Sequence, residues 1–213
     1  MTQKTFWDDP YLTSHTARIE KVEGTTVFLD STIIFAFSGG QESDRGTIGD
    51  IPVIRAEACG KEIAYTLPEN HGLSVGGIVM MKIDWDRRYR LMKLHFAAEL
   101  VLELVYRNFP GVEKIGAHIA EEKARLDFAL EESVSPFLPM IAASVNELIQ
   151  SDHRIVSAFE DERTERRYWA IEGFARVPCG GTHIKSTGEI GSIRLKRNNI
   201  GKGKERIEIH LDQ

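Results

Sequence analysis

The chain has no long apolar run. No segment approaches the roughly 18 consecutive apolar residues that a membrane-spanning helix needs, which argues against a membrane partner. The start of the chain, Met1 to Asp9, has neither the basic region nor the apolar region of a secretory signal peptide. We therefore expect a cytoplasmic protein.

Cysteine is scarce, with only Cys59 and Cys179 among 213 residues. Because the cytoplasm is reducing, we expect both to be thiols rather than a disulfide pair. Internal repeats and low-complexity stretches are also lacking. Hydrophobic residues make up 42% of the chain and charged residues 28%, which is ordinary for a globular protein and argues against disorder.

Lys and Arg are fewer than Asp and Glu, 27 against 32, so the net charge is -5. This balance argues against a protein that coats nucleic acid indiscriminately. Basic residues predominate locally between Arg176 and Arg206, where there are eight Lys or Arg residues and two acids. One end of the molecule can thus meet a phosphate backbone, through the loop Gly201 to Arg206, unless that loop is only a solvated hairpin. No aromatic residues interleave with these charges, so base stacking is not indicated.

The first part of the chain reads as short strands separated by glycine-containing turns. Strands at this spacing indicate a small barrel or sandwich, and we expect a β-barrel-like domain over residues 1–85. The predicted strands are Thr16 to Glu20, Thr25 to Asp30, Ile33 to Phe37, Pro52 to Glu57, Glu62 to Leu67 and Ile78 to Ile83.

The pattern changes after Asp84. Apolar residues then recur at helical spacing until Asn108, Pro110 and Gly111 end the helix. A second helix is predicted from Pro136 to Gln150. The strands predicted around it are Lys114 to Ala120, Lys123 to Leu130 (where a helix also fits), Ile155 to Phe159, Tyr168 to Glu172, Ser192 to Arg197 and Arg206 to Leu211. Residues 86–213 are thus predicted to form an α+β domain, with helices on a mostly antiparallel sheet.

Four side chains from two distant segments have the chemistry of metal ligands. His95 and Glu99 lie one turn apart on the predicted helix, so both can face one ion. Alone, this pair also fits a buried histidine beside a solvated charge. Cys179 and His183 flank two glycines and a threonine, and their thiolate and imidazole can wrap a small ion. Although Cys179 also fits a small buried residue, the two pairs together predict one four-ligand site.

Two further residues are candidates for contact with a substrate. Gln41 lies in the glycine-rich loop Ser38 to Gly46, whose backbone N–H groups can hold a phosphate or a ribose, although most such loops are only turns. Gln41 can orient a substrate amine or carbonyl. Thr182, between the glycines and His183, offers a hydroxyl. We expect Gln41 and Thr182 to act in catalysis.

At these residues the chain resembles the freestanding alanyl-tRNA editing proteins (the AlaX group), which are similar to the editing domain of alanyl-tRNA synthetase. The resemblance covers nearly the whole chain. It is carried most specifically by Cys179-Gly180-Gly181-Thr182-His183, and also by Gly39-Gly40-Gln41, Asp44-Arg45-Gly46, Asp84-Trp85, Leu94-His95, Gly116 to Phe128 and Thr187-Gly188-Glu189-Ile190-Gly191.

The resemblance implies a β-barrel-like first domain, an α+β editing domain and a zinc ion. The ligands it implies are His95, Cys179 and His183, with Glu99 where the family usually has a second histidine. Phe96 likewise replaces a threonine common in the family. The implied activity is hydrolysis of the aminoacyl ester of mischarged tRNA(Ala), with serine as the expected amino acid and glycine as an alternative. The expected partner is the acceptor end of tRNA(Ala), with no role for DNA.

Two other functions fit the same residues. A non-catalytic tRNA-binding module, in which the zinc site is structural or vestigial, is favoured by the loss of the histidine at position 99. Editing of a threonyl-tRNA-type substrate shares the metal pattern but not the Gly-Gly-Gln loop, so it ranks last.

Overall fold

The computed structural model describes residues 1–212. The chain forms two compact units: Met1–Ser38 with Glu42–Tyr89, and Gly39–Gln41 with the chain from Arg90 onward. The helix α1 (Trp85–Asn108) begins in the first unit and continues into the second. The assignment of independent domains to residues 1–85 and 86–213 stays a prediction.

The first unit is built from a seven-stranded antiparallel sheet, in the order β6-β5-β9-β2-β3-β8-β7. Alternation along β9 shows how the sequence shapes it, because Val79 and Met81 are buried while Met80 and Lys82 face solvent. Two-residue strands β1 and β4 pair in parallel beside the 3-10 helix η1 (Thr5–Trp7). The strands are β1 (Gln3–Lys4), β2 (Ser14–Glu23), β3 (Thr26–Leu29), β4 (Ser31–Thr32), β5 (Gly46–Ile48), β6 (Ile51–Pro52), β7 (Arg55–Cys59), β8 (Glu62–Thr66) and β9 (Ile78–Ile83).

The strand predicted from Ile33 to Phe37 does not form. Ile33 to Ala36 are buried, as their apolar character indicates, but side chains replace the strand ladder as backbone partners. The N–H of Phe35 donates to the Asp44 carboxylate at 2.7 Å, and the carbonyl of Ile33 accepts from Arg88 at 2.6 Å. An apolar run therefore predicted burial correctly and backbone conformation wrongly, because these polar partners come from distant residues.

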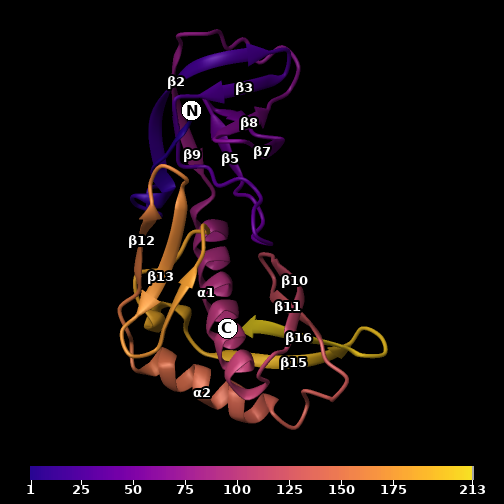
Figure 1. The fold of residues 1–213 in the computed structure, drawn as a ribbon. Helices are drawn as coiled ribbons and strands as arrows, with labels where there is room; N and C mark the ends of the chain where they lie inside the picture. The colour runs from indigo at the N-terminus through magenta and orange to yellow at the C-terminus, as the bar shows by residue number, and fades with distance from the viewer. Residues whose placement is uncertain (213) are drawn as a thin grey trace. The chain divides into compact units, whose positions relative to one another are not determined.

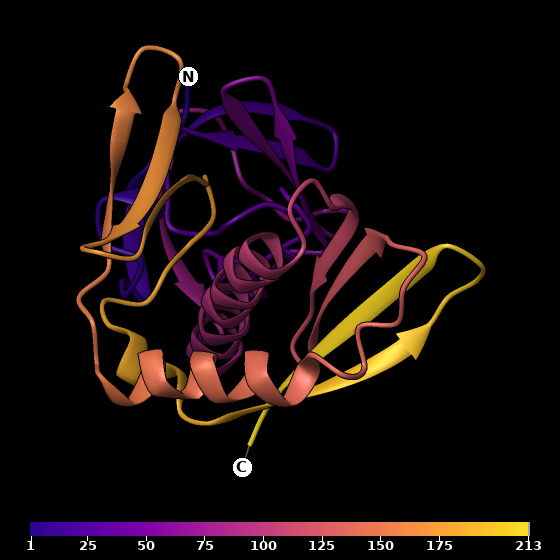
Figure 2. The ribbon, with the colours of Figure 1, turned by 60° about the horizontal axis from the view of Figure 1, so that its bottom comes forward.

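The second unit places α1 between two antiparallel sheets, as both views show (Figures 1 and 2). One sheet has the order β10-β11-β16-β15, and the other β12-β13-β14. The helix α2 packs along β15, and the 3-10 helix η2 (Thr187–Ile190) lies against α2. The remaining elements are β10 (Glu113–Ile119), β11 (Ala124–Ala129), α2 (Leu138–Gln150), β12 (Val156–Asp161), β13 (Arg166–Ile171), β14 (Ala175–Pro178), β15 (Ile193–Asn199) and β16 (Lys204–Leu211).

The helix predicted after Asp84 is confirmed, and its apolar stripe is buried. Each fully buried Leu or Val contributes about 1.5–3 kcal/mol relative to exposure. The stripe comprises Leu91, Leu94, Ala98, Val101, Leu102 and Val105. The second helix starts at Leu138 rather than Pro136, with Pro139 in its first turn. The strands β1, β4, β5 and β14 were not predicted, but the α+β class with a mostly antiparallel sheet is confirmed. Among residues 1–212, no helix has the length and apolar character to cross a membrane.

Candidate metal centre

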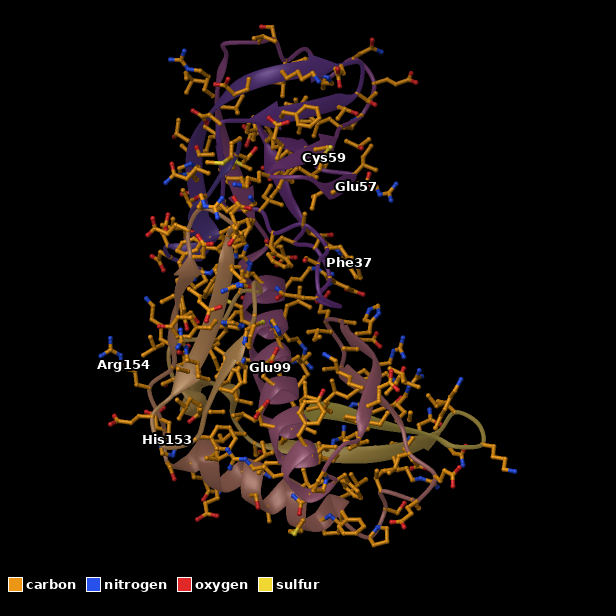
Figure 3. All side chains as sticks on the ribbon, in the orientation of Figure 1. Phe37, Glu57, Cys59, Glu99, His153 and Arg154 are labelled. Atoms are coloured by element: carbon orange, nitrogen blue, oxygen red, sulfur yellow. The ribbon has the colours of Figure 1, made fainter. Side chains whose placement is uncertain are left out.

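Four polar side chains converge within the second unit. His95 and Glu99 project from α1, where a spacing of four residues places both on one face; Figure 3 labels Glu99 on this helix. Cys179 follows directly after β14, and His183 comes four residues later. The backbone N–H of Cys179 donates to the carbonyl of Arg167 at 2.9 Å, which anchors the start of this loop to β13.

The donor atoms are separated by distances that suit a tetrahedral ion. Cys179 Sγ lies 3.5 Å from His95 Nε2, 3.3 Å from His183 Nε2 and 3.4 Å from Glu99 Oε1. His95 Nε2 lies 3.2 Å from the same carboxylate oxygen. In a tetrahedral zinc site with bonds of about 2.0 to 2.3 Å, neighbouring donor atoms are about 3.3 to 3.8 Å apart. The residues present therefore fit a zinc ion.

Not all four side chains are equivalent. Ligand atoms of His95, Cys179 and His183 all lie within 4.8 Å of one another, which makes them a self-consistent three-ligand group. Glu99 contacts two of these three. A carboxylate is a harder ligand than imidazole, so in this mixed set it would be the weakest of the four.

Two further side chains orient the candidate ligands. Ser157, on β12, places its hydroxyl 2.9 Å from His183 Nδ1, so that Nε2 points to Cys179. Trp169, on β13, donates its indole N–H to Glu99 Oε2 at 3.2 Å. Such outer hydrogen bonds fix the tautomer of a ligating histidine and the direction of a ligating carboxylate. Sequence patterns did not reveal either residue, since nothing local in β12 or β13 indicates a partner on α1 or in the Cys179 loop.

Charge within the cluster is uneven. Burial opposes the charge on His95, but attraction to Cys179 and the hydrogen bond with Glu99 outweigh it and raise the pKa of His95 to about 10. Burial and repulsion by His95 lower the pKa of His183 to about 3. Burial also opposes the charge on Glu99, but its hydrogen bond with His95 prevails and lowers the pKa to about 2. The environment of His95 thus favours a positive charge. A divalent ion bound here would provide that charge in place of the proton on His95.

The backbone of Gly181 lies close to the side chains of both His95 and Gln41. A β-carbon added to Gly181 would lie 2.1 Å from His95 Cε1 and 2.8 Å from Gln41 Oε1, both too close for a side chain. Glycine is therefore required here by close approach. His95 Nδ1, on this side of the ring, is buried and has no hydrogen-bond partner among the described residues.

Gln41 and Thr182 also meet within this unit. The Gln41 amide donates to Thr182 Oγ1 at 2.8 Å, and its carbonyl accepts from the Thr182 backbone N–H at 3.2 Å. Both side chains are buried, and Gln41 forms a parallel bridge with Ile119 at the end of β10. Because Thr182 Oγ1 accepts this bond, its own proton points elsewhere. The glycine-rich loop is thus no simple turn, since it delivers Gln41 to Thr182.

The chain is similar to known proteins of tRNA aminoacylation and editing. Residues 168–208 match the family model of the threonyl and alanyl tRNA synthetase second additional domain. Alanyl-tRNA editing protein AlaX-M of Pyrococcus horikoshii is 35% identical, covering 100% of this chain and 99% of its own. The AlaX-M protein of Saccharolobus solfataricus is 33% identical over 97% of this chain and 98% of its own.

Part of a longer enzyme is also similar. The alanine–tRNA ligase of Ignicoccus hospitalis is 31% identical over 97% of this chain, which corresponds to 26% of the ligase. The chain thus matches about a quarter of the ligase, whereas it matches nearly the full length of the AlaX-M proteins. On this full-length similarity, the chain belongs to the AlaX-M family of alanyl-tRNA editing proteins.

Proposed function

We propose that this protein is an aminoacyl-tRNA deacylase that edits tRNA(Ala) in trans, hydrolysing the ester of Ser-tRNA(Ala). The observation that carries the proposal is the convergence of His95, Cys179 and His183, next to the Gln41–Thr182 pair. Gly181 lies between His95 and Gln41, close to both. Membership of an editing family supports the reaction class.

Zinc is the cofactor that the donor set favours, with His95, Glu99, Cys179 and His183 as its ligands. When bound, zinc would supply Lewis-acid polarisation of an ester carbonyl or of water. Four protein ligands close a tetrahedral ion, and three leave one position open. The placement of Glu99 therefore decides between a structural and a catalytic role for the ion.

Thr182 and Gln41 are the residues that we assign to the substrate. Gln41 fixes the rotamer of Thr182 by accepting from its backbone and donating to its hydroxyl oxygen. The hydroxyl proton of Thr182 then donates to a substrate oxygen. A site that hydrogen-bonds the hydroxyl of serine discriminates strongly against alanine, which has no such group.

The test is deacylation of Ser-tRNA(Ala), with Ala-tRNA(Ala) measured in parallel. We expect loss of serine with alanine spared, and loss of this activity in Cys179→Ala together with loss of bound metal. Cys59→Ala is the matched control, because Cys59 is exposed and belongs to the first unit. A protein that deacylates neither substrate, or one whose Cys179→Ala variant keeps stoichiometric metal, would contradict the proposal.

One alternative has its own supporting observation. Glu99 completes the cluster where the resemblance predicts a histidine, which favours a non-catalytic tRNA-binding module with a structural zinc site. Glu99→His separates the two functions. Faster hydrolysis in the variant indicates an attenuated enzyme, and no hydrolysis in either form indicates the binding module.

A further inference from the structure

The four-stranded sheet of the second unit has two faces of different chemistry. Residues at alternate positions share a face, and directly paired residues on neighbouring strands share it as well. One face is buried and mainly apolar along its central strands. Its buried members on β11 and β16 are Ala124, Leu126, Phe128, Glu205, Ile207, Ile209 and Leu211.

The opposite face is basic. Register pairs Arg125 with Glu208, Asp127 with Arg206, and Lys196 with Glu208, so these side chains lie on one surface. Lys123 joins them through an ion pair with Glu208 at 2.6 Å. The cationic residues of this surface are Lys123, Arg125, Arg194, Lys196, Lys204 and Arg206, and we call it the basic sheet face.

Carboxylates order this face without neutralising it. Asp127 lies between Arg125 and Arg206, and Arg206 donates to both of its oxygens, at 2.6 and 2.9 Å. Gly116 lies opposite Asp127 on β10, where a β-carbon would approach the carboxylate to 3.2 Å. Each guanidinium has five N–H donors in a fixed fork, so Asp127 holds both forks in place and leaves donors for an external anion.

The outer cations are well exposed. The side chain of Arg194 is 71% exposed although it pairs with Asp212 at 3.4 Å, and Lys196 and Lys204 are exposed as well. Across its four strands, this face carries the six cations and four acids, Glu113, Asp127, Glu208 and Asp212. This excess stands out in a chain whose net charge is -5.

We propose that the basic sheet face binds the phosphate backbone of double-stranded RNA in the tRNA substrate. The proposal rests on the proposed function for the identity of the polyanion, and it adds where the RNA stem binds. Phosphate contacts use Lys and Arg, position the partner and carry no sequence information. The cross-strand positions of the face carry no Phe, Tyr or Trp, so they suit a backbone rather than stacked bases.

An acidic protein is the competing partner, and the face fits it less well. Protein interfaces have a buried centre enriched in aromatic residues and depleted in charge. Here the centre of the face is the Arg125, Asp127 and Arg206 cluster, flanked by charged residues on neighbouring strands. Such a surface is better matched to a polyanion whose charges are exposed along its whole length.

The test measures binding of uncharged tRNA(Ala) by fluorescence anisotropy across a salt series. Lys196→Glu combined with Lys204→Glu is compared with Arg55→Glu combined with Lys82→Glu. The second pair makes the same change in net charge on exposed strand residues of the first unit. We expect binding about tenfold or more weaker in the first pair, with a plot of log K against log salt shallower by about two. The control pair should bind like the unaltered protein.

Lys196→Gln with Lys204→Gln guards against misfolding, because it removes charge without adding repulsion next to Glu208. It should show the same direction of change with a smaller loss. The proposal would be overturned if the Lys196/Lys204 double variants, to Glu and to Gln, bound tRNA with the affinity and salt slope of the unaltered protein. It would also be overturned if the control pair lost as much affinity as the Lys196→Glu, Lys204→Glu pair. Competition by polyglutamate as effective as that by an RNA duplex would overturn it too. Uncharged tRNA keeps this test separate from hydrolysis: an inactive protein that still binds through this face refutes the editing activity alone.

Discussion

The indole N–H of Trp169 donates to Glu99 Oε2 at 3.2 Å, while Oε1 of the same carboxylate faces both His95 and Cys179. One oxygen is thus held by the sheet and the other is directed into the cluster. This geometry presents Glu99 as a one-oxygen ligand.

Trp169→Phe removes that donor and keeps an aromatic ring against Phe96, whose ring centroid is 5.0 Å away. We expect metal affinity to fall by about 10- to 100-fold, which is typical for loss of an outer hydrogen bond to a ligand. Competition with a chromophoric chelator measures it, and the absorption spectrum of the cobalt-loaded protein reports the ligand geometry. Unchanged affinity and spectrum would show that Trp169 only packs.

Ser157→Ala removes the partner of His183 Nδ1. The imidazole then loses the bond that fixes its ring and tautomer, so metal affinity should again fall by about 10- to 100-fold. Ser157→Thr, which keeps a hydroxyl, should restore much of it. If alanine and threonine behave alike in chelator competition, hydrogen bonding to His183 is not the cause.

Gly181→Ala places a methyl group 2.1 Å from His95 Cε1 and 2.8 Å from Gln41 Oε1. Relief requires the His95 ring or the Cys179 loop to move, which should cost metal occupancy and deacylation together. Gly180→Ala is the matched control, since a β-carbon there meets nothing within 4 Å. Metal analysis of the two purified variants decides the question, and equal occupancy would refute the steric requirement.

Asp44→Asn tests a buried ion pair in the first unit. Asp44 and Arg88 have fully buried side chains, and Arg88 also donates to the carbonyls of Pro10 and Ile33. Neutralising Asp44 leaves a buried guanidinium charge unpaired, so the free energy of unfolding should fall by about 3–5 kcal/mol. The exposed Asp50–Lys82 pair is the control, and Asp50→Asn should cost about 1 kcal/mol or less. Urea denaturation measures both, and similar small losses would contradict the assignment.

Acid should weaken the four-stranded sheet through Asp127. Burial opposes its ionisation, but the hydrogen bond from Arg206 and the charge of Arg125 prevail and lower its pKa. A carboxyl whose folded pKa is lowered contributes stability above its unfolded pKa of about 3.9, and this stability is lost as the pH falls further. Stability measured between neutral pH and pH 3 should therefore decline less in Asp127→Asn than in the unaltered protein. Parallel curves would show that Asp127 does not contribute.

The periodicity of the apolar residues and the spacing of the polar ones predicted much of the fold. The stripe from Leu91 to Val105 identified α1, and helical spacing placed His95 and Glu99 on one of its faces. Convergence with Cys179 and His183 was predicted from ligand chemistry and is observed, while their role as ligands stays a prediction. The failed strand at Ile33 to Phe37 shows the limit, since apolar character reports burial but not the distant carboxylate that captures a backbone N–H. Ser157 and Trp169 were also missed, because their hydrogen-bond partners His183 and Glu99 are distant in the sequence.

Gln41, which binds Thr182, belongs to the segment Gly39–Gln41, and this segment packs with the second unit although the rest of that unit begins at Arg90. The candidate centre is therefore not encoded by one contiguous stretch of sequence. A fragment beginning at residue 86 would keep all four candidate ligands and lose the clamp on Thr182. Transplanting the site into another protein would thus require two separate pieces of sequence. A metal-binding fragment without Gln41 would be a natural background for adding that residue back and measuring its contribution to hydrolysis alone.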